Sequence, residues 1–161
     1  MNKMEQKYRN ARANLLLMAI LTVLNIILLV TESSISFPFS AVIPQISAIW
    51  SVIWLGMEQT VPAVLGIAVA VICLAAYFLC YFFSKKHYGW MIAALCLFSL
   101  DSLACLYYTL KNFDAAYLID VAFHGWVMYY LIIGVINGAR LRQNPAAETE
   151  ETAEPQDLQN L

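Results

Sequence analysis

Long apolar segments separated by short polar connections dominate this amino-acid sequence. Four of them approach or exceed the roughly 20 residues that an α-helix needs to cross hydrocarbon, and they cover about residues 13–31, 61–83, 90–110 and 117–139. Hydrophobic residues make up 61% of the 161-residue chain and charged residues only 12%, which is atypical of a soluble globular domain. Because backbone groups in hydrocarbon must satisfy one another and strand-like alternation is absent, we expect an all-α, four-helix transmembrane bundle.

The basic residues predict the orientation, since Lys and Arg are retained preferentially on the cytoplasmic side. With four spans, eight of the nine Lys and Arg residues face the cytoplasm and Lys111 alone lies outside. A fifth crossing would reduce this asymmetry to five against four. We therefore expect a multi-pass protein of the cell inner (plasma) membrane with both termini cytoplasmic. Its basic first twelve residues should extend the first helix and meet anionic headgroups.

A weaker apolar segment, residues 34–60, lies between the first two spans and contains Pro38 and Pro44. Pro44 suits the first turn of a helix. Apolar residues recur around it at helical spacing: Ile43, Ile46, Ile49, Trp50, Ile53, Trp54 and Met57. A helix over about residues 44–55 would be roughly 18 Å long, too short to cross. We expect an outer amphipathic helix on the membrane surface or a shallow re-entrant segment, capping the bundle.

The domain organisation follows from these segments. Residues 1–142 should form one four-span membrane domain. The remaining segment, 143–161, is acidic, contains no Lys or Arg and shows no apolar periodicity, which predicts a disordered cytoplasmic tail. A solvated tail is favoured over a docking segment for a basic partner.

Three ionisable side chains fall within the spans: Asp101, Asp120 and His124. Because such groups are costly in hydrocarbon when unpaired, they normally face the bundle interior. Asp120 and His124 are one helical turn apart. Counted along an antiparallel hairpin, His124 and Asp101 lie roughly 10 and 13 Å inside the outer boundary, and Asn25 of the first span about 9 Å. We predict a polar pocket in the outer half, formed by Asn25, Asp101, Asp120 and His124 beneath the amphipathic segment.

Three interpretations of this polar cluster are left open. An Asp–His or Asp–Asn hydrogen bond could fix the helix register, as polar contacts commonly do between membrane helices. The cluster could instead bind a proton or cation, because histidine changes charge near physiological pH. Two carboxylates and one imidazole could also hold a divalent metal ion, although their spacing is not diagnostic. The structural bond is favoured.

Other motifs are few. Phosphate-binding glycine motifs, paired CxxC motifs and HExxH are absent, so no cofactor or metal is expected, and no basic, aromatic-interleaved patch predicts nucleic-acid binding. Gly134 and Gly138 form a GxxxG pattern, and Gly66 with Ala70 forms a related one. Such patterns allow close helix packing, within the bundle or between copies in a homo-oligomer, and packing within the bundle is favoured.

Four segments, "NARANLLLMAILTVLNIILLV", "FPFSAVIPQ", "FSKKHYGWMIAAL" and "DVAFHGWVMYYL", resemble a family of small, uncharacterised bacterial four-span integral membrane proteins. The resemblance covers nearly the whole chain except the acidic tail. It implies a bacterial membrane location and no established activity.

From the residues themselves, the leading hypothesis is a non-enzymatic integral membrane protein. It would bind a small molecule, a lipid or a membrane-protein partner in the outer-half pocket, with Asp101 and His124 as polar anchors. The alternatives are a proton- or ion-coupled transporter subunit and, third, a metal-dependent membrane enzyme.

Overall fold

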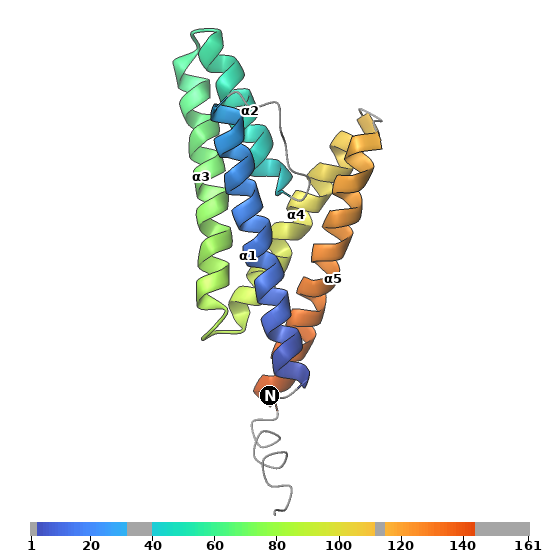
Figure 1. Ribbon diagram of the computed structural model, residues 1–161. Coiled ribbons are helices and arrows are strands. Elements are labelled where there is room, and N and C mark those ends of the chain that lie inside the picture. Colours follow the sequence, from blue (N-terminus) through green and yellow to red (C-terminus); the bar gives the residue numbers. More distant parts are fainter. Residues whose placement is uncertain (1–2, 32–39, 112–114, 144–161) are drawn as a thin grey trace, which may run out of the picture.

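The computed structural model describes residues 3–31, 40–111 and 115–143, with side chains described from residue 118 onward in the last range. It contains α1 (Lys3–Val30), α2 (Val42–Gly56), α3 (Thr60–Phe83), α4 (Gly89–Lys111) and α5 (Ala115–Gln143) (Figure 1). Four of these helices are long and apolar enough to cross a membrane, and α2 is the shorter helix between the first two of them. The predicted all-α, four-span fold class is therefore confirmed. The predicted disordered tail lies, from residue 144 onward, outside the described residues.

The helices run up and down between two ends of the bundle (Figure 1). The terminal end holds Lys3, the α3–α4 turn and Gln143, and the α2 end holds Val30, the α2–α3 turn and Lys111. The closest pairings are α1 with α5, α2 with α3, and α4 with α5. Toward the α2 end, α4 and α5 lean away from α3, and the first turn of α2 lies near α4.

α2 does not lie across the end of the bundle but begins in its interior and runs outward beside α3 (Figure 1). Of the two predicted arrangements, this one resembles the re-entrant segment, although the helix starts beside the middle of α4 rather than at a shallow depth. The helix starts at Val42 and ends at Gly56, slightly longer than the predicted 44–55. Because α2 starts inside the bundle, the other helices must supply hydrogen-bond acceptors for its first N–H groups.

The small, polar side of α2 packs inward, while its bulky apolar side faces out. Ser51 is buried, whereas Trp50 is 48% exposed. A Cβ added to Gly66 of α3 would overlap the Ser51 hydroxyl and lie 2.9 Å from the carbonyl oxygen of Ser47. The Ser47 and Ser51 hydroxyls donate to the carbonyls of Ile43 and Ser47 at 2.8 and 2.7 Å. Small side chains allow two helices to approach closely where lipid competes for every bulky apolar contact.

Close packing also joins α1 to α5. A Cβ added to Gly134 would lie 2.5 Å from the Cβ of Ala11, and one added to Gly138 would lie 2.7 Å from Tyr88 and 2.8 Å from Tyr8. The GxxxG pattern is therefore used for packing within the chain, as the sequence favoured.

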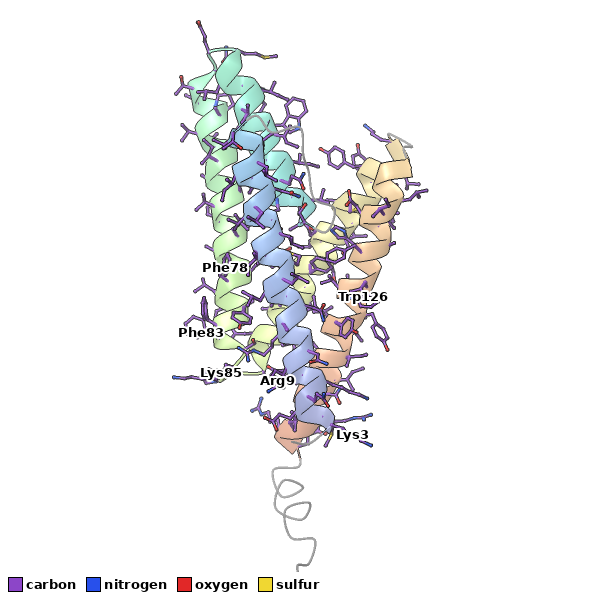
Figure 2. The ribbon with its side chains drawn as sticks, in the orientation of Figure 1. Lys3, Arg9, Phe78, Phe83, Lys85 and Trp126 are labelled. Carbon is purple, nitrogen blue, oxygen red and sulfur yellow. The ribbon has the colours of Figure 1, made fainter. Side chains whose placement is uncertain are left out.

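The bundle has a small buried cluster, and many large apolar side chains are exposed on its outside. Large side chains such as Phe83 and Trp126, 44% and 57% exposed, project outward (Figure 2). This distribution suits helices surrounded by hydrocarbon rather than water. The buried cluster consists of Ala11, Leu15, Met18, Ala19, Ala41, Tyr77, Cys80, Met91, Ala94, Phe98, Val127 and Leu131.

Replacing Gly134 with alanine should destabilise the protein relative to the matched Gly125→Ala variant, because nothing lies within 4 Å of a Cβ at Gly125. Both variants gain the roughly 1 kcal/mol by which alanine favours a helix over glycine. Only Gly134→Ala forces α1 and α5 apart, at a cost of about 1–3 kcal/mol. Unfolding of the detergent-solubilised variants should show this difference. Equal stabilities would contradict the close α1–α5 contact.

Candidate functional site

The carboxylate of Asp101 lies at the centre of the site, on the middle of α4. Its side chain is 0% exposed. Counting about 1.5 Å per residue from Lys111 at the end of α4, Asp101 lies roughly 15 Å deep, about half of the roughly 30 Å hydrocarbon thickness. A carboxylate at this depth is stable only with close partners.

Its first partner is the start of α2. The backbone N–H of Val42 donates to Oδ2 of Asp101 at 2.9 Å, and that of Ile43 donates to Oδ1 at 2.7 Å. These two N–H groups belong to the first turn of α2, where no helical carbonyl can accept them. Asp101 therefore caps α2 from another helix. The partial positive charge at a helix N-terminus also favours an anion at this position.

The remaining two of the first four positions at the start of α2, Ala41 and Pro44, leave no unpaired N–H group either. The N–H of Ala41, the residue before the helix, donates to Oγ1 of Thr22 on α1 at 2.8 Å. The Thr22 hydroxyl in turn donates to the carbonyl of Met18 at 2.9 Å. Pro44 has no N–H to satisfy. The interior start of α2 thus leaves no backbone donor unpaired.

The second partner of Asp101 is His124 of α5. Nε2 of His124 lies 3.0 Å from Oδ2 of Asp101, and Nδ1 lies 2.8 Å from the backbone carbonyl oxygen of Asp120. The ring is 3% exposed and stacks on Phe98, with centroids 5.1 Å apart and planes inclined by 11°. Because Phe98 lies one turn before Asp101 on α4, the stacked ring and the ion pair join the same two helices.

These contacts determine how many protons the pair holds. A carbonyl oxygen can only accept a hydrogen bond, so Nδ1 of His124 carries a hydrogen. Nε2 and Oδ2 can then bond only if one further proton lies between them, on either atom. The pair is either an imidazolium beside a carboxylate or a neutral imidazole beside a carboxylic acid. Its net charge is zero in both forms, which lowers the free energy of burying it in hydrocarbon.

The structure brings some of the predicted site residues together directly. Asp101 and His124 are in contact, and Asp120 takes part through its backbone carbonyl. Asn25 is 4% exposed on α1, three residues after Thr22, and so lies on the same side of that helix. Their predicted role in binding a ligand or a proton remains a prediction.

Sequence reasoning missed Thr22 and the backbone donors of α2. The available signal was the absence of a side-chain cap: Ala41 precedes the helix, and Ala41 makes no side-chain cap hydrogen bond. A helix that begins in an apolar environment without Ser, Thr, Asp or Asn in this position needs a cap from elsewhere.

Polar groups in this part of the molecule are engaged with one another. Throughout the described ranges, every buried side-chain nitrogen and oxygen has a hydrogen-bond partner. The same ranges contain no group of three or more His, Cys, Asp or Glu side chains placed to hold a metal ion.

The cavities beside the site are apolar. One of about 220 Å³ lies against Asp101, between the start of α2, α3 and α4. Another of about 450 Å³ lies between α1, α2 and α3, and its lining consists of Ile26, Leu29, Val30, Ala48, Ser51, Val52, Leu55, Ile67, Ala70, Val71 and Leu74. Ser51 is the one polar residue in this lining, and its hydroxyl is bonded within α2. We call this space the α1–α2–α3 cavity.

Comparison with known protein families, with proteins of curated function and with solved structures found no match. The family resemblance of the four quoted segments therefore stays a prediction.

Replacing Asp101 with asparagine should destabilise the protein by about 1–3 kcal/mol. Asparagine keeps one acceptor oxygen but places an NH₂ group where the second accepts, so the N–H of Val42 or Ile43 loses its partner. Ser102→Ala is the matched control on the same helix, because among the described residues the Ser102 hydroxyl donates to the carbonyl of Phe98 alone, at 2.8 Å. Chemical unfolding of detergent-solubilised protein measures both. Equal losses would contradict the capping role of Asp101.

Proposed function

We propose that this chain is a non-enzymatic integral membrane protein that binds an apolar chain, such as that of a fatty acid or lipid, in the α1–α2–α3 cavity. The observation that carries this proposal is the cavity itself, about 450 Å³ in volume and lined almost entirely by apolar side chains. This volume lies within the roughly 300–1,000 Å³ of typical small-molecule sites, and such sites are lined mostly by apolar groups.

The cavity is accessible from the surroundings of the bundle. Several lining side chains are also exposed on its outside, including Leu55 at 61% and Val71 at 58%. An apolar molecule dissolved in the bilayer could therefore reach this lining without crossing water. Small residues on the inner wall, Ala48 and Ala70, leave the space open.

The polar pair contributes to this role indirectly. Val42 and Ile43 at the start of α2 are held by Asp101, while Ala48 and Ser51 farther along the same helix form a wall of the cavity. Asp101 and His124 thus position the wall rather than touch the bound molecule. This differs from the sequence-based hypothesis, in which the two side chains themselves anchored the ligand.

The basic residues support a location in the inner (plasma) membrane with both termini in the cytoplasm. The fold places Lys3 and Lys85 at the terminal end with Arg9 (Figure 2). Arg140 and Arg142 lie in the last turn of α5 at the same end, and Lys111 ends α4 at the opposite one. Under the preference of Lys and Arg for the cytoplasm, the α2 end faces outward.

Filling part of the cavity should weaken binding without unfolding the protein. Ala70→Leu adds roughly three carbons to the lining, and each displaced methylene is worth about 0.8 kcal/mol, so affinity should fall on the order of tenfold or more. Labelling by a photoactivatable palmitic acid analogue, with mapping of the labelled peptides, measures the effect. Ala68→Leu is the control, since Ala68 is exposed on α3 and does not line the cavity.

Two further results decide the interpretation of this experiment. In the absence of the probe, Ala70→Leu should be as stable as the wild type, because filling a cavity removes empty space rather than creating it. Equal labelling of both variants, or labelling confined to helices outside the cavity, would show that the cavity is not the binding site.

A second candidate, a proton- or ion-coupled transporter subunit, is favoured by one specific observation. Asp101 and His124 share a single proton at about half the depth of the bundle, next to the start of a re-entrant helix. Histidine is the side chain whose charge most readily changes near neutral pH. Loss of the proton would leave two acceptor atoms facing each other 3.0 Å apart, so α4, with the start of α2 bonded to Asp101, would lose this hydrogen bond to α5.

The stability of the wild type should therefore fall by about 1–3 kcal/mol on the alkaline side, where the shared proton is lost. His124→Gln should flatten that part of the profile, because its amide N–H can donate to Asp101 at any pH. The other titratable side chains around the pair, Cys73 and Tyr77 on α3, Cys105 on α4 and Asp120 on α5, remain in both proteins. The difference between the two profiles of unfolding temperature against pH therefore reports the contribution of the Asp101–His124 pair. Parallel profiles would contradict the proton-coupled role.

A further inference from the structure

An apolar groove, separate from the two cavities near α2, lies at the terminal end of the bundle, between α1 and α3. It encloses about 270 Å³ and is lined by Arg9, Arg12, Tyr81 and four apolar side chains of α1 between Ala13 and Ile20. It shares no lining residue with the α1–α2–α3 cavity. Two guanidinium groups at one end of an apolar groove form an amphipathic site.

The guanidinium of Arg12 is held rigidly at this site. Its Nε–H donates to Oγ of Ser84 at 2.9 Å, and Nη2 donates to the carbonyl of Tyr81 at 3.1 Å. The guanidinium also lies over the Tyr81 ring, 5.0 Å from its centroid. Because arginine has five N–H donors and these contacts use two, donors remain for an anion in a fixed position.

Arg9 adds a second positive charge, and no ion pair joins its side chain to another described residue. It lies three residues before Arg12, on the same side of α1, and its side chain is exposed. No carboxylate is among the residues that line the groove, and the Asp101–His124 pair lies on other helices. Lys85 and Lys86 follow Ser84 in the chain, and Figure 2 shows Lys85 at the same end as Arg9. Arg9, Arg12, Lys85 and Lys86 therefore gather positive charge at this end of the described structure.

The position of these groups along α1 matches the structure of a bilayer lipid. Arg9 and Arg12 lie where α1 changes from its charged beginning to its continuous apolar stretch. From Ala13 to Ile20 the groove continues into the apolar part for about 10 Å. The cations thus lie at the level of phosphate groups, and the apolar lining lies at the level of acyl chains.

We propose that this groove binds an anionic phospholipid. Arg9 and Arg12 hold its phosphate, since arginine donates pairs of hydrogen bonds to phosphate oxygens. One acyl chain lies along the apolar side chains of α1 against Tyr81. A headgroup with an added cation would be disfavoured by Lys85 and Lys86, so the site prefers phosphatidylglycerol to phosphatidylcholine.

The test uses the full-length protein in detergent and its thermal unfolding midpoint as a function of added lipid. Phosphatidylglycerol should raise the midpoint saturably and more than phosphatidylcholine with the same chains. Arg9→Gln should raise the half-saturating lipid fraction about fivefold, the effect of about one surface cation. Arg140→Gln, the same charge change at an exposed position of α5, should leave it unchanged. Arg9 is suited to this test because no described residue depends on its side chain.

Two additional arms separate a groove from a charged surface. Glycerophosphoglycerol, the headgroup without chains, should produce no shift at the same concentration. Ala13→Phe, which fills the groove, should abolish the phosphatidylglycerol shift, whereas Ala93→Phe on the exposed side of α4 should not. The proposal is overturned if Arg9→Gln and Arg140→Gln weaken the effect equally, if the two lipids act alike, or if the headgroup alone suffices.

Discussion

A helix that begins inside hydrocarbon must have its first N–H groups paired by other parts of the protein. Water cannot serve this purpose there, and each unpaired group would be destabilising by several kcal/mol. In this structure, Asp101 accepts from Val42 and Ile43, and Thr22 accepts from Ala41. The burial of Asp101 has its own free-energy cost, which the helix N-terminus and the proton shared with His124 offset. The carboxylate and the helix start are each stable at this depth because of the other.

The rest of the bundle follows from this arrangement. Thr22 connects α1 to the start of α2, and Asp101 and His124 extend the connection through α4 to α5. A related solution appears at the opposite end, where the last turn of α3 receives hydrogen bonds from α1. There Tyr8 donates to the carbonyl of Ser84 at 2.6 Å, and Arg12 donates to that of Tyr81. Because lipid tails compete for apolar contacts, capped helix ends and small-residue packing carry much of the specificity of such a fold.

The sequence predicted the parts that depend on one helix or on helix length alone. The four spans follow from apolar segments of sufficient length, and the meeting of Asp101 with His124 follows from counting a fixed rise along two antiparallel helices. The use of Asp101 was not predictable in this way, because its partners are backbone N–H groups, which every residue except proline carries. The face of α2 that packs inward could not be predicted either, since an amphipathic pattern does not say which face a membrane helix turns toward its neighbours. The cavities depend on how three helices cross, which no local pattern determines.

The two proposed roles of the α2 half of the molecule both depend on the position of α2. The first turn of α2 is held by the pair that shares a proton, and residues about two to three turns later form a wall of the α1–α2–α3 cavity. α2 has no side-chain cap of its own, so its position depends on Asp101. A molecule that binds the cavity contacts this pair only through α2. If its binding changes how the start of α2 bonds to Asp101, then by thermodynamic reciprocity loss of the proton changes its affinity by the same factor. Under these proposals, binding in the cavity and proton release are coupled through the start of one helix.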